Sequence, residues 1–251
     1  MYAIRSYYDP NPVKLEPEPD WDSLLWHWHR VTVAKRCDQK TTASNGSDKK
    51  VYMIGGQGIK DEMDELDIDH FGDGPDPVDE QPASKGSAFL YELELEEKME
   101  RVGAVVVGYE KYFNYLKLMK AANYLRNEDC LFVATNEDET CPGPNPETVI
   151  PDAGPLVAAV RTASGRDPHV VGKPNTPAFD YICRRWTIDP RRTLMVGDRL
   201  NTDVKFGNDH GLRTMLVLSG CHGVGRTIEK MFSNLMESDD SGWRKYRRIP
   251  D

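Results

Sequence analysis

The chain has 251 residues and is acidic, with 32 basic and 41 acidic side chains and a net charge of −9. This charge argues against general binding to nucleic acid or to anionic membranes, although a bound cation can invert the field locally. No apolar run approaches the roughly 20 residues of a membrane helix, and the N-terminal stretch MYAIRSYYDPNP lacks the apolar region of a secretory signal.

The five cysteines are scattered along the chain and form no CxxC pair. This spacing favours unpaired thiols over a disulfide or zinc framework. We therefore expect a reduced, cytoplasmic protein.

Residues 1–50 are expected to be irregular, because they are rich in Pro, Glu, Ser, Asn and Lys and show little periodicity. Regular patterning begins at Val51. From there the pattern predicts one α/β domain over residues 51–166. A second α/β portion with a charged tail is predicted over residues 167–251.

Short apolar strands alternate with helical segments in both regions. The expected strands cover residues 51–54, 104–109, 130–136, 169–172, 193–198 and 214–220. The expected helices cover residues 58–66, 112–126, 155–164, 177–186 and 204–211, with a loop over residues 72–87 and another after residue 136. Near-continuous apolar strands separated by helices predict an α/β fold with parallel sheets covered on both faces.

The segment LMVGDRLNTD carries two candidate metal ligands. Asp198 follows an apolar strand, so it is expected at the carboxyl edge of a sheet, where ligands bind in open α/β folds. Asp203 comes five residues later, where the chain re-enters a helix. Two carboxylates at one point suit Mg²⁺, which takes a few carboxylates together with water and substrate phosphate. Taken alone, Asp203 could equally be a helix N-cap.

The segment VVGKPNTP places Lys173 at the end of another expected strand. An ammonium group there can offset the charge of a carboxylate nucleophile and of a phosphoryl group. Taken alone, Lys173 could also be a surface lysine that leads into a turn. The GxxxxGK[ST] context of a P-loop is absent.

Together, VGKPNTPAFDYI and LMVGDRLNTDVKFGNDHGLRTMLVLSG resemble the haloacid dehalogenase (HAD) superfamily, and most closely its phosphoglycolate phosphatase and 4-nitrophenylphosphatase type. The segments VYMIGGQGIKDEM, AVVVGYEKYFNYLKLMKA and LFVATNEDETCP resemble the cap domain of that type. The resemblance runs from about Val51 to about Gly223. It implies a Rossmann-like three-layer HAD core with an α/β cap that covers the active site.

The resemblance also implies roles for individual residues. Lys173 would pair with the nucleophile and the phosphate, Asp198 would hold Mg²⁺, and Asp203 would be a second ligand or would support the first. The substrate would be a small phosphorylated metabolite, a phosphate monoester such as phosphoglycolate, chosen by the cap. A homodimer formed through the cap is a further expectation.

The nucleophile motif of this family is DxDG followed by two apolar residues and Trp, and Asp20-Trp21-Asp22-Ser23-Leu24-Leu25-Trp26 resembles it. Asp20 would then be the nucleophile and Asp22 the acid/base. The preceding KLEPEP is incompatible with a buried central strand, and Ser23 replaces the glycine. The sequence leaves two expectations: a Mg²⁺-dependent phosphatase that uses Asp20, or a noncatalytic or truncated HAD-like protein with an incomplete core, acting as a binding or dimerisation module.

Asn136 and Asp138 lie at the end of the expected strand 130–136, where the family resemblance implies structural or substrate-facing loop residues. Short polar side chains of this kind are also typical of turns. We expect the turn.

Overall fold

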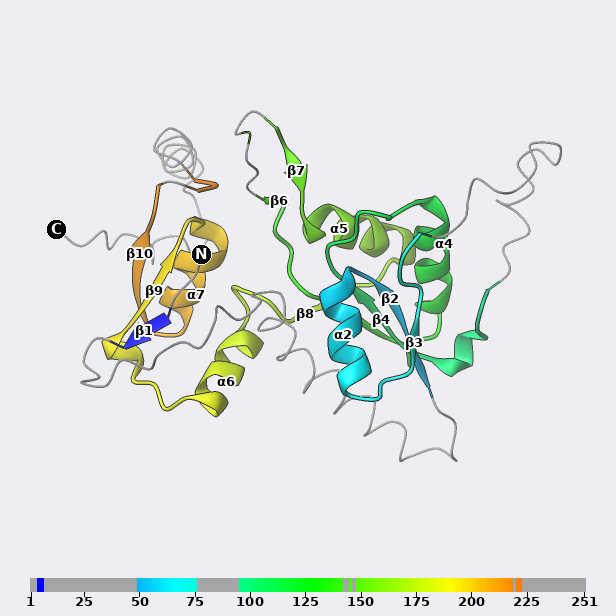
Figure 1. Cartoon of the computed structure of the whole chain (residues 1–251), viewed down its shortest axis with the longest axis horizontal. Coiled ribbons are helices and arrows are strands. Elements are labelled where there is room, and N and C mark those ends of the chain that lie inside the picture. Colours follow the sequence, from blue (N-terminus) through cyan, green and yellow to red (C-terminus); the bar gives the residue numbers. More distant parts are fainter. Residues whose placement is uncertain are drawn as a thin grey trace. The chain divides into compact units, whose positions relative to one another are not determined.

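The computed structural model describes residues 4–6, 49–75, 95–141, 145, 148–218 and 220–222. These residues belong to two compact units (Figure 1). The first unit takes its described residues from Met1–Lys14, Pro142–Pro146 and Lys173–Asp251, and the second takes them from Leu15–Cys141 and Glu147–Gly172. Each unit is described by itself below.

The second unit is built on a parallel sheet with the strand order β3-β2-β4-β5-β8. All four neighbouring pairs are parallel, and β2 and β4 pair from Val51 opposite Ala104 to Ile54 opposite Val107. The strands are β2 (Lys50–Ile54), β3 (His70–Phe71), β4 (Val102–Val107), β5 (Leu131–Ala134) and β8 (His169–Val170). The predicted α/β fold class with parallel sheets is confirmed.

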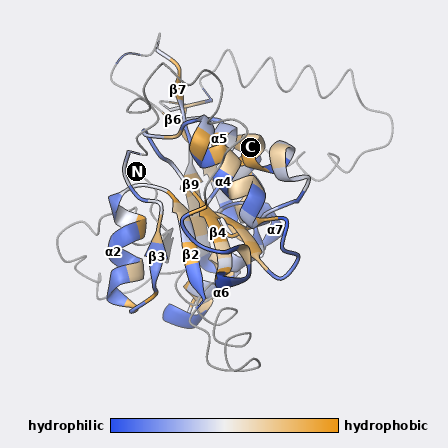
Figure 2. Ribbon diagram, turned by 90° about the vertical axis from the view of Figure 1, so that its right-hand side faces the viewer, coloured by the Kyte–Doolittle hydropathy of each residue, from blue (hydrophilic) through white to orange (hydrophobic). Residues whose placement is uncertain are grey.

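Helices cover both faces of this sheet. Because side chains alternate along a strand, Tyr52 and Ile54 of β2 face the core that contains residues of α4 (Tyr115–Tyr124) and α5 (Ala153–Ser164). The opposite face carries Val51 and Met53, which are also fully buried. Helix α2 (Gln57–Glu65) buries Ile59 and Met63, and its remaining surface is largely hydrophilic, whereas β4 is hydrophobic throughout (Figure 2).

Local signals explain where the longer helices of this unit begin and end. Asn114 caps α4 by accepting a hydrogen bond from the Lys117 backbone N–H, and Asp152 accepts from the Ala153 N–H at the start of α5. Helix α5 ends at Gly165, which has the left-handed conformation (φ 67°) that glycine adopts without strain. A short 3-10 helix, η2 (Met99–Arg101), leads into β4.

Three short strands of the second unit were not predicted. Strand β3 pairs with the edge of β2 close to the expected loop 72–87. The expected loop after residue 136 contains an antiparallel pair, β6 (Thr140–Cys141) and β7 (Ile150–Pro151). Two-residue strands give no period-2 pattern, so the sequence carries no signal for them.

The first unit contains a sheet with the order β1-β9-β10. Strands β9 (Thr193–Gly197) and β10 (Arg213–Leu216) are parallel, and β1 (Ile4–Ser6) pairs antiparallel with β9. Ile4–Ser6 lies in the region that was expected to be irregular. The other described residues of that region are Lys49 and Lys50, which begin the second unit's first described segment.

The described part of the first unit contains four helical segments beside its sheet. They are α6 (Thr176–Arg185), the 3-10 helix η3 (Pro190–Arg192), the π-helical turn η4 (Leu200–Val204) and α7 (Lys205–Asp209). Met195 of β9, Phe206 of α7 and Leu212 are buried together, and Phe179 of α6 packs against them. This small core holds the strand end from which the acidic loop leaves.

No helix in the described ranges has both the length and the apolar character needed to cross a membrane. The described cysteines, which are Cys130, Cys141, Cys183 and Cys221, form no disulfide with one another.

Candidate active site

The acidic loop leaves the carboxyl end of β9, in the first unit. Asp198 follows Gly197 directly and is only 8% exposed. A Cβ atom at Gly197 would lie 2.2 Å from the Cγ of Asp203, which is closer than real Cβ contacts come. Glycine at this position therefore lets the Asp203 carboxylate approach the strand end.

Asp203 is the most buried charged group of the site, at 1% exposure. Its Oδ2 accepts hydrogen bonds from the backbone N–H groups of Asp198 (3.1 Å) and Arg199 (3.0 Å). Its Oδ1 accepts from the Lys173 Nζ at 2.7 Å. The Asp203 side chain thus binds the backbone at the start of the acidic loop. It does not act as the simple helix N-cap that was its alternative reading.

Lys173 reaches the loop from the segment before α6. Its side chain is 17% exposed, so the ion pair with Asp203 is shielded from bulk water on most sides. Lys173 and Asp203, both predicted as site residues, are brought into direct contact, and Asp198 is joined to them through its backbone N–H. Asp20 and Asp22, the predicted nucleophile and acid/base, lie outside the described residues.

A second turn, Gly220–His222, holds Asp198 from the side of β10. The Cys221 N–H donates to Asp198 Oδ2 at 2.7 Å, and the His222 N–H donates to the Asp198 carbonyl at 3.2 Å. A Cβ at Gly220 would lie 2.1 Å from Asp198 Oδ2, so glycine permits this approach. The carboxyl ends of parallel strands share one sheet edge, which is why the turn meets Asp198.

Sequence reasoning missed this turn. Its signal was the position of Cys221 and His222 directly after the expected strand 214–220, which is parallel to and adjacent to the strand of Asp198. The thiol of Cys221 interacts with the Arg199 and Asp198 side chains. Burial raises the pKa of this thiol, and the Arg199 contact opposes the shift only in part. The thiol is therefore protonated at neutral pH.

The donor set is compatible with a Mg²⁺ ion that takes few protein ligands. Within the described ranges, no three or more His, Cys, Asp or Glu side chains are grouped to hold a metal. Mg²⁺ commonly binds through one or two carboxylates and fills its shell with water and substrate phosphate oxygens. Asp198, a buried carboxylate at a strand end with Asp203 behind it, meets that requirement.

Asn136 and Asp138 lie in the second unit, after β5. The Asp138 N–H donates to the Asn136 Oδ1 at 3.3 Å, which is the side-chain-to-backbone bond of an Asx-type turn. The expected turn is confirmed at this position.

Comparisons with known proteins agree with the α/β fold. The family described as HAD-hydrolase-like matches residues 170–233, which contain Lys173, Asp198 and Asp203. Glycerol-3-phosphate phosphatase of Gallus gallus is 42% identical over 67% of this chain and 52% of its own length. Phosphoglycolate phosphatase 1A of Arabidopsis thaliana, a chloroplastic protein, is 41% identical over 70% of this chain and 47% of its own length. The chain therefore spans about half the length of these curated relatives.

Solved structures show the same likeness. A 4-nitrophenylphosphatase from Thermotoga maritima has a TM-score of 0.56 and 27% identity, over 81% of this chain and 64% of that one. Glycerol phosphate phosphatase Rv1692 from Mycobacterium tuberculosis in complex with magnesium has a TM-score of 0.50 and 26% identity, over 75% of this chain and 49% of that one.

Mostly parallel sheets packed against helices, and a lysine paired with a buried acidic loop at the end of a strand, define the class of α/β proteins that bind ligands at strand ends. Within that class, the chain is similar to the HAD superfamily, whose family model matches residues 170–233.

Proposed function

We propose that the chain is a Mg²⁺-dependent phosphatase that hydrolyses a small phosphate monoester such as phosphoglycolate. The single observation that supports this most strongly is the contact of Lys173 with Asp203 at the base of the Asp198 loop. It places one fixed cation beside carboxylates that would otherwise repel a phosphate dianion. The similarity to a glycerol-3-phosphate phosphatase and a phosphoglycolate phosphatase supports the same reaction class.

Mg²⁺ would be held by Asp198, and it would supply positive charge to the phosphate oxygens when bound. The magnesium complex of the Mycobacterium tuberculosis relative supports this choice of ion. Asp203 has both carboxylate oxygens engaged, by Lys173 and by two backbone N–H groups. We propose that Asp203 supports the metal site from behind and orients Asp198, which is the second of the two roles that the family resemblance implies for it.

Lys173 would lie beside the phosphoryl group and reduce its charge repulsion with an attacking carboxylate. In the proposed reaction, an Asp20 carboxylate oxygen forms a bond to phosphorus while the bond from phosphorus to the ester oxygen breaks. Asp22 gives its proton to the departing alkoxide, then takes a proton from the water that releases phosphate from Asp20. These two roles are carried over from the family resemblance.

Turnover of the full chain with a panel of phosphate esters tests this proposal. Phosphoglycolate, glycerol 3-phosphate and pyridoxal phosphate should be compared with Mg²⁺ present. We expect hydrolysis that stops in Asp20→Asn and slows in Asp22→Asn, because the first removes the nucleophile and the second the proton donor. Unchanged turnover in Asp20→Asn would remove this residue from the mechanism.

We also propose, as a second candidate function, self-association through the second unit. Tyr109, Tyr112 and Tyr115 are 49%, 42% and 58% exposed within one seven-residue stretch, and aromatic residues are enriched at interfaces. Sedimentation at several concentrations would detect a dimer. Tyr115→Lys should weaken it, whereas Trp186→Lys, at a 48% exposed residue of the other unit, should not.

The proposed location is cytoplasmic. It is supported by the scattered cysteines and by the absence of disulfides among the four that the structure describes.

A further inference from the structure

Three consecutive backbone N–H groups line the start of the acidic loop. The N–H groups of Asp198 and Arg199 donate hydrogen bonds to Asp203 Oδ2. The third, from Leu200, donates to the Nδ1 atom of His222 at 2.9 Å. Asp203 and His222 therefore complete one series of hydrogen bonds, although only Asp203 belongs to the motif that the sequence analysis identified.

His222 contacts the loop at two points. Its side chain accepts from the Leu200 N–H, and its own backbone N–H donates to the Asp198 carbonyl at 3.2 Å. The residue is 6% exposed, so water does not readily replace either bond. A buried backbone N–H without an acceptor is disfavoured, and loss of the ring nitrogen would leave the Leu200 N–H in that state.

We propose that His222 is a positioning residue that fixes the backbone at Leu200 and thereby holds the Asp198 carboxylate in place for the divalent cation. This inference rests on the proposed function, in which Asp198 holds Mg²⁺. The residues behind a metal ligand commonly set the affinity of the site, because they fix the direction of the ligand's lone pairs.

The chemistry of the ring supports positioning over direct metal binding. A ring nitrogen that accepts an N–H must present a lone pair, so Nδ1 of His222 carries no proton. That lone pair is directed at the Leu200 N–H, which leaves it unavailable to a metal. A ring that merely filled space would not need an acceptor at this position, and this difference can be measured.

Three substitutions in the full chain separate the two roles. His222→Asn places an amide oxygen near the position of Nδ1, His222→Gln places its amide near Nε2, and His222→Leu keeps similar bulk without an acceptor. Calorimetric titration with Mg²⁺ should give an affinity within about threefold of the parent protein for His222→Asn and losses of about tenfold or more for the other two. His210→Gln, at the end of α7, is a control and should bind Mg²⁺ like the parent protein.

Hydrogen exchange at the Leu200 amide gives a readout that does not depend on the metal. Protection should persist in His222→Asn and fall in His222→Gln and His222→Leu. If the leucine variant does not fold, the Asn and Gln variants still carry the comparison. If the parent protein binds Mg²⁺ and the Asn and Gln variants bind it with equal affinity, the positioning role of His222 is overturned, while the proposed function is not. A parent protein that binds no Mg²⁺ would overturn the proposed function and this role with it.

Discussion

Lys173 and Asp203 are 30 residues apart in the sequence, and the Lys173 Nζ lies 2.7 Å from the Asp203 Oδ1. The lysine comes from the segment that leads into α6, and the aspartate comes from η4, so one ion pair joins two elements of the first unit. The other carboxylate oxygen of Asp203, Oδ2, accepts hydrogen bonds from the Asp198 and Arg199 backbone N–H groups. Its loss is therefore expected to affect both stability and the shape of the loop.

Lys173→Met should lower the free energy of unfolding by about 2 kcal/mol, since Asp203 would keep its charge and burial but lose its cation. Lys205→Met is the matched control. The Lys205 Nζ lies 2.6 Å from the Asp209 Oδ2, but the two side chains are 40% and 42% exposed. The control should lose less than about 1 kcal/mol. Urea denaturation measures both values, and equal losses would contradict the special role of the Lys173 pair.

Gly197→Ala should disturb the site because the new Cβ would lie 2.4 Å from Asp203 Oδ2. We expect a loss of about 1–3 kcal/mol of stability, together with a loss of Mg²⁺ binding. Gly211→Ala is the control: Gly211 has φ 72° with no atom within 4 Å of its Cβ position. It should lose about 1 kcal/mol from backbone strain and should bind Mg²⁺ normally. Calorimetry that shows normal binding in Gly197→Ala would refute the steric account.

The second unit contains a separate buried ion pair. Lys117 Nζ lies 2.5 Å from Glu110 Oε2 and also donates to the Gly72 carbonyl at 2.9 Å, with side-chain exposures of 1% and 2% for the pair. Lys117→Met should destabilise the unit by about 3–5 kcal/mol, because it leaves the Glu110 charge buried without its partner. Adding Glu110→Gln should recover part of that loss. Urea unfolding followed by circular dichroism gives the three values.

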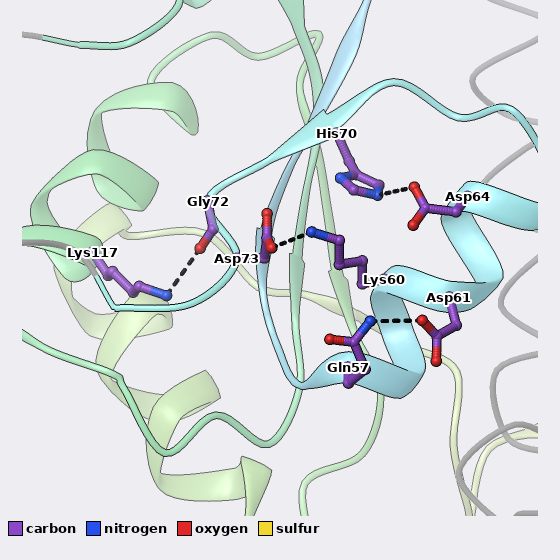
Figure 3. A network of polar contacts seen from close by, with 8 residues as sticks. All are labelled: Gln57, Lys60, Asp61, Asp64, His70, Gly72, Asp73 and Lys117. Carbon is purple, nitrogen blue, oxygen red and sulfur yellow. Dashed lines mark hydrogen bonds and ion pairs between the residues drawn. The ribbon is translucent and has the colours of Figure 1, made fainter.

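Figure 3 shows the control for this prediction, the pair of Lys60 and Asp73, together with the Lys117 bond to Gly72. Lys60 and Asp73 are about one-third exposed, at 33% and 35%. Lys60→Met should lower the free energy of unfolding much less than Lys117→Met, because water screens the exposed pair. A loss as large as that of Lys117→Met would show that burial does not decide the strength of these pairs.

The pH dependence of stability should include a contribution from Asp73. The hydrogen bond from Lys60 lowers the pKa of Asp73 below its ordinary 3.8, and partial burial opposes the shift. A carboxyl group with a lowered folded pKa stabilises the fold above its unfolded pKa, and this contribution disappears as the pH falls through the folded value. The melting temperature of Asp73→Asn should therefore lie below that of the parent protein at about pH 6, with a smaller gap at about pH 2.5. A gap that does not shrink would contradict this linkage.

The sequence was a good guide to the sheet of the second unit and to the edges where the polar residues lie. Strands such as Val102–Val107 are buried on both faces, so they appear as continuous apolar runs. It was a poor guide to β3, because His70–Phe71 is too short for a pattern and one of its two residues is polar.

The candidate site was predicted only in part. Strand-end positions identified Lys173, Asp198 and Asp203, but spacing could not show that Asp203 binds two backbone N–H groups of its own loop. His222 was missed for a related reason. Its contribution is one hydrogen bond to the backbone of Leu200, 22 residues earlier, and such a bond leaves no motif in a single sequence.

The most direct test of the central claim is hydrolysis of 4-nitrophenyl phosphate by the purified 251-residue chain with and without Mg²⁺, beside Asp198→Asn and the control Asp209→Asn. Asp209 is an exposed residue of α7 that pairs with Lys205. We predict Mg²⁺-dependent turnover in the parent protein and in Asp209→Asn, with a loss of about a hundredfold or more in Asp198→Asn, because the charge that holds the cation is removed. Turnover that is independent of Mg²⁺, or that persists in Asp198→Asn, would contradict the assignment of Asp198 as the metal-binding residue of a phosphatase.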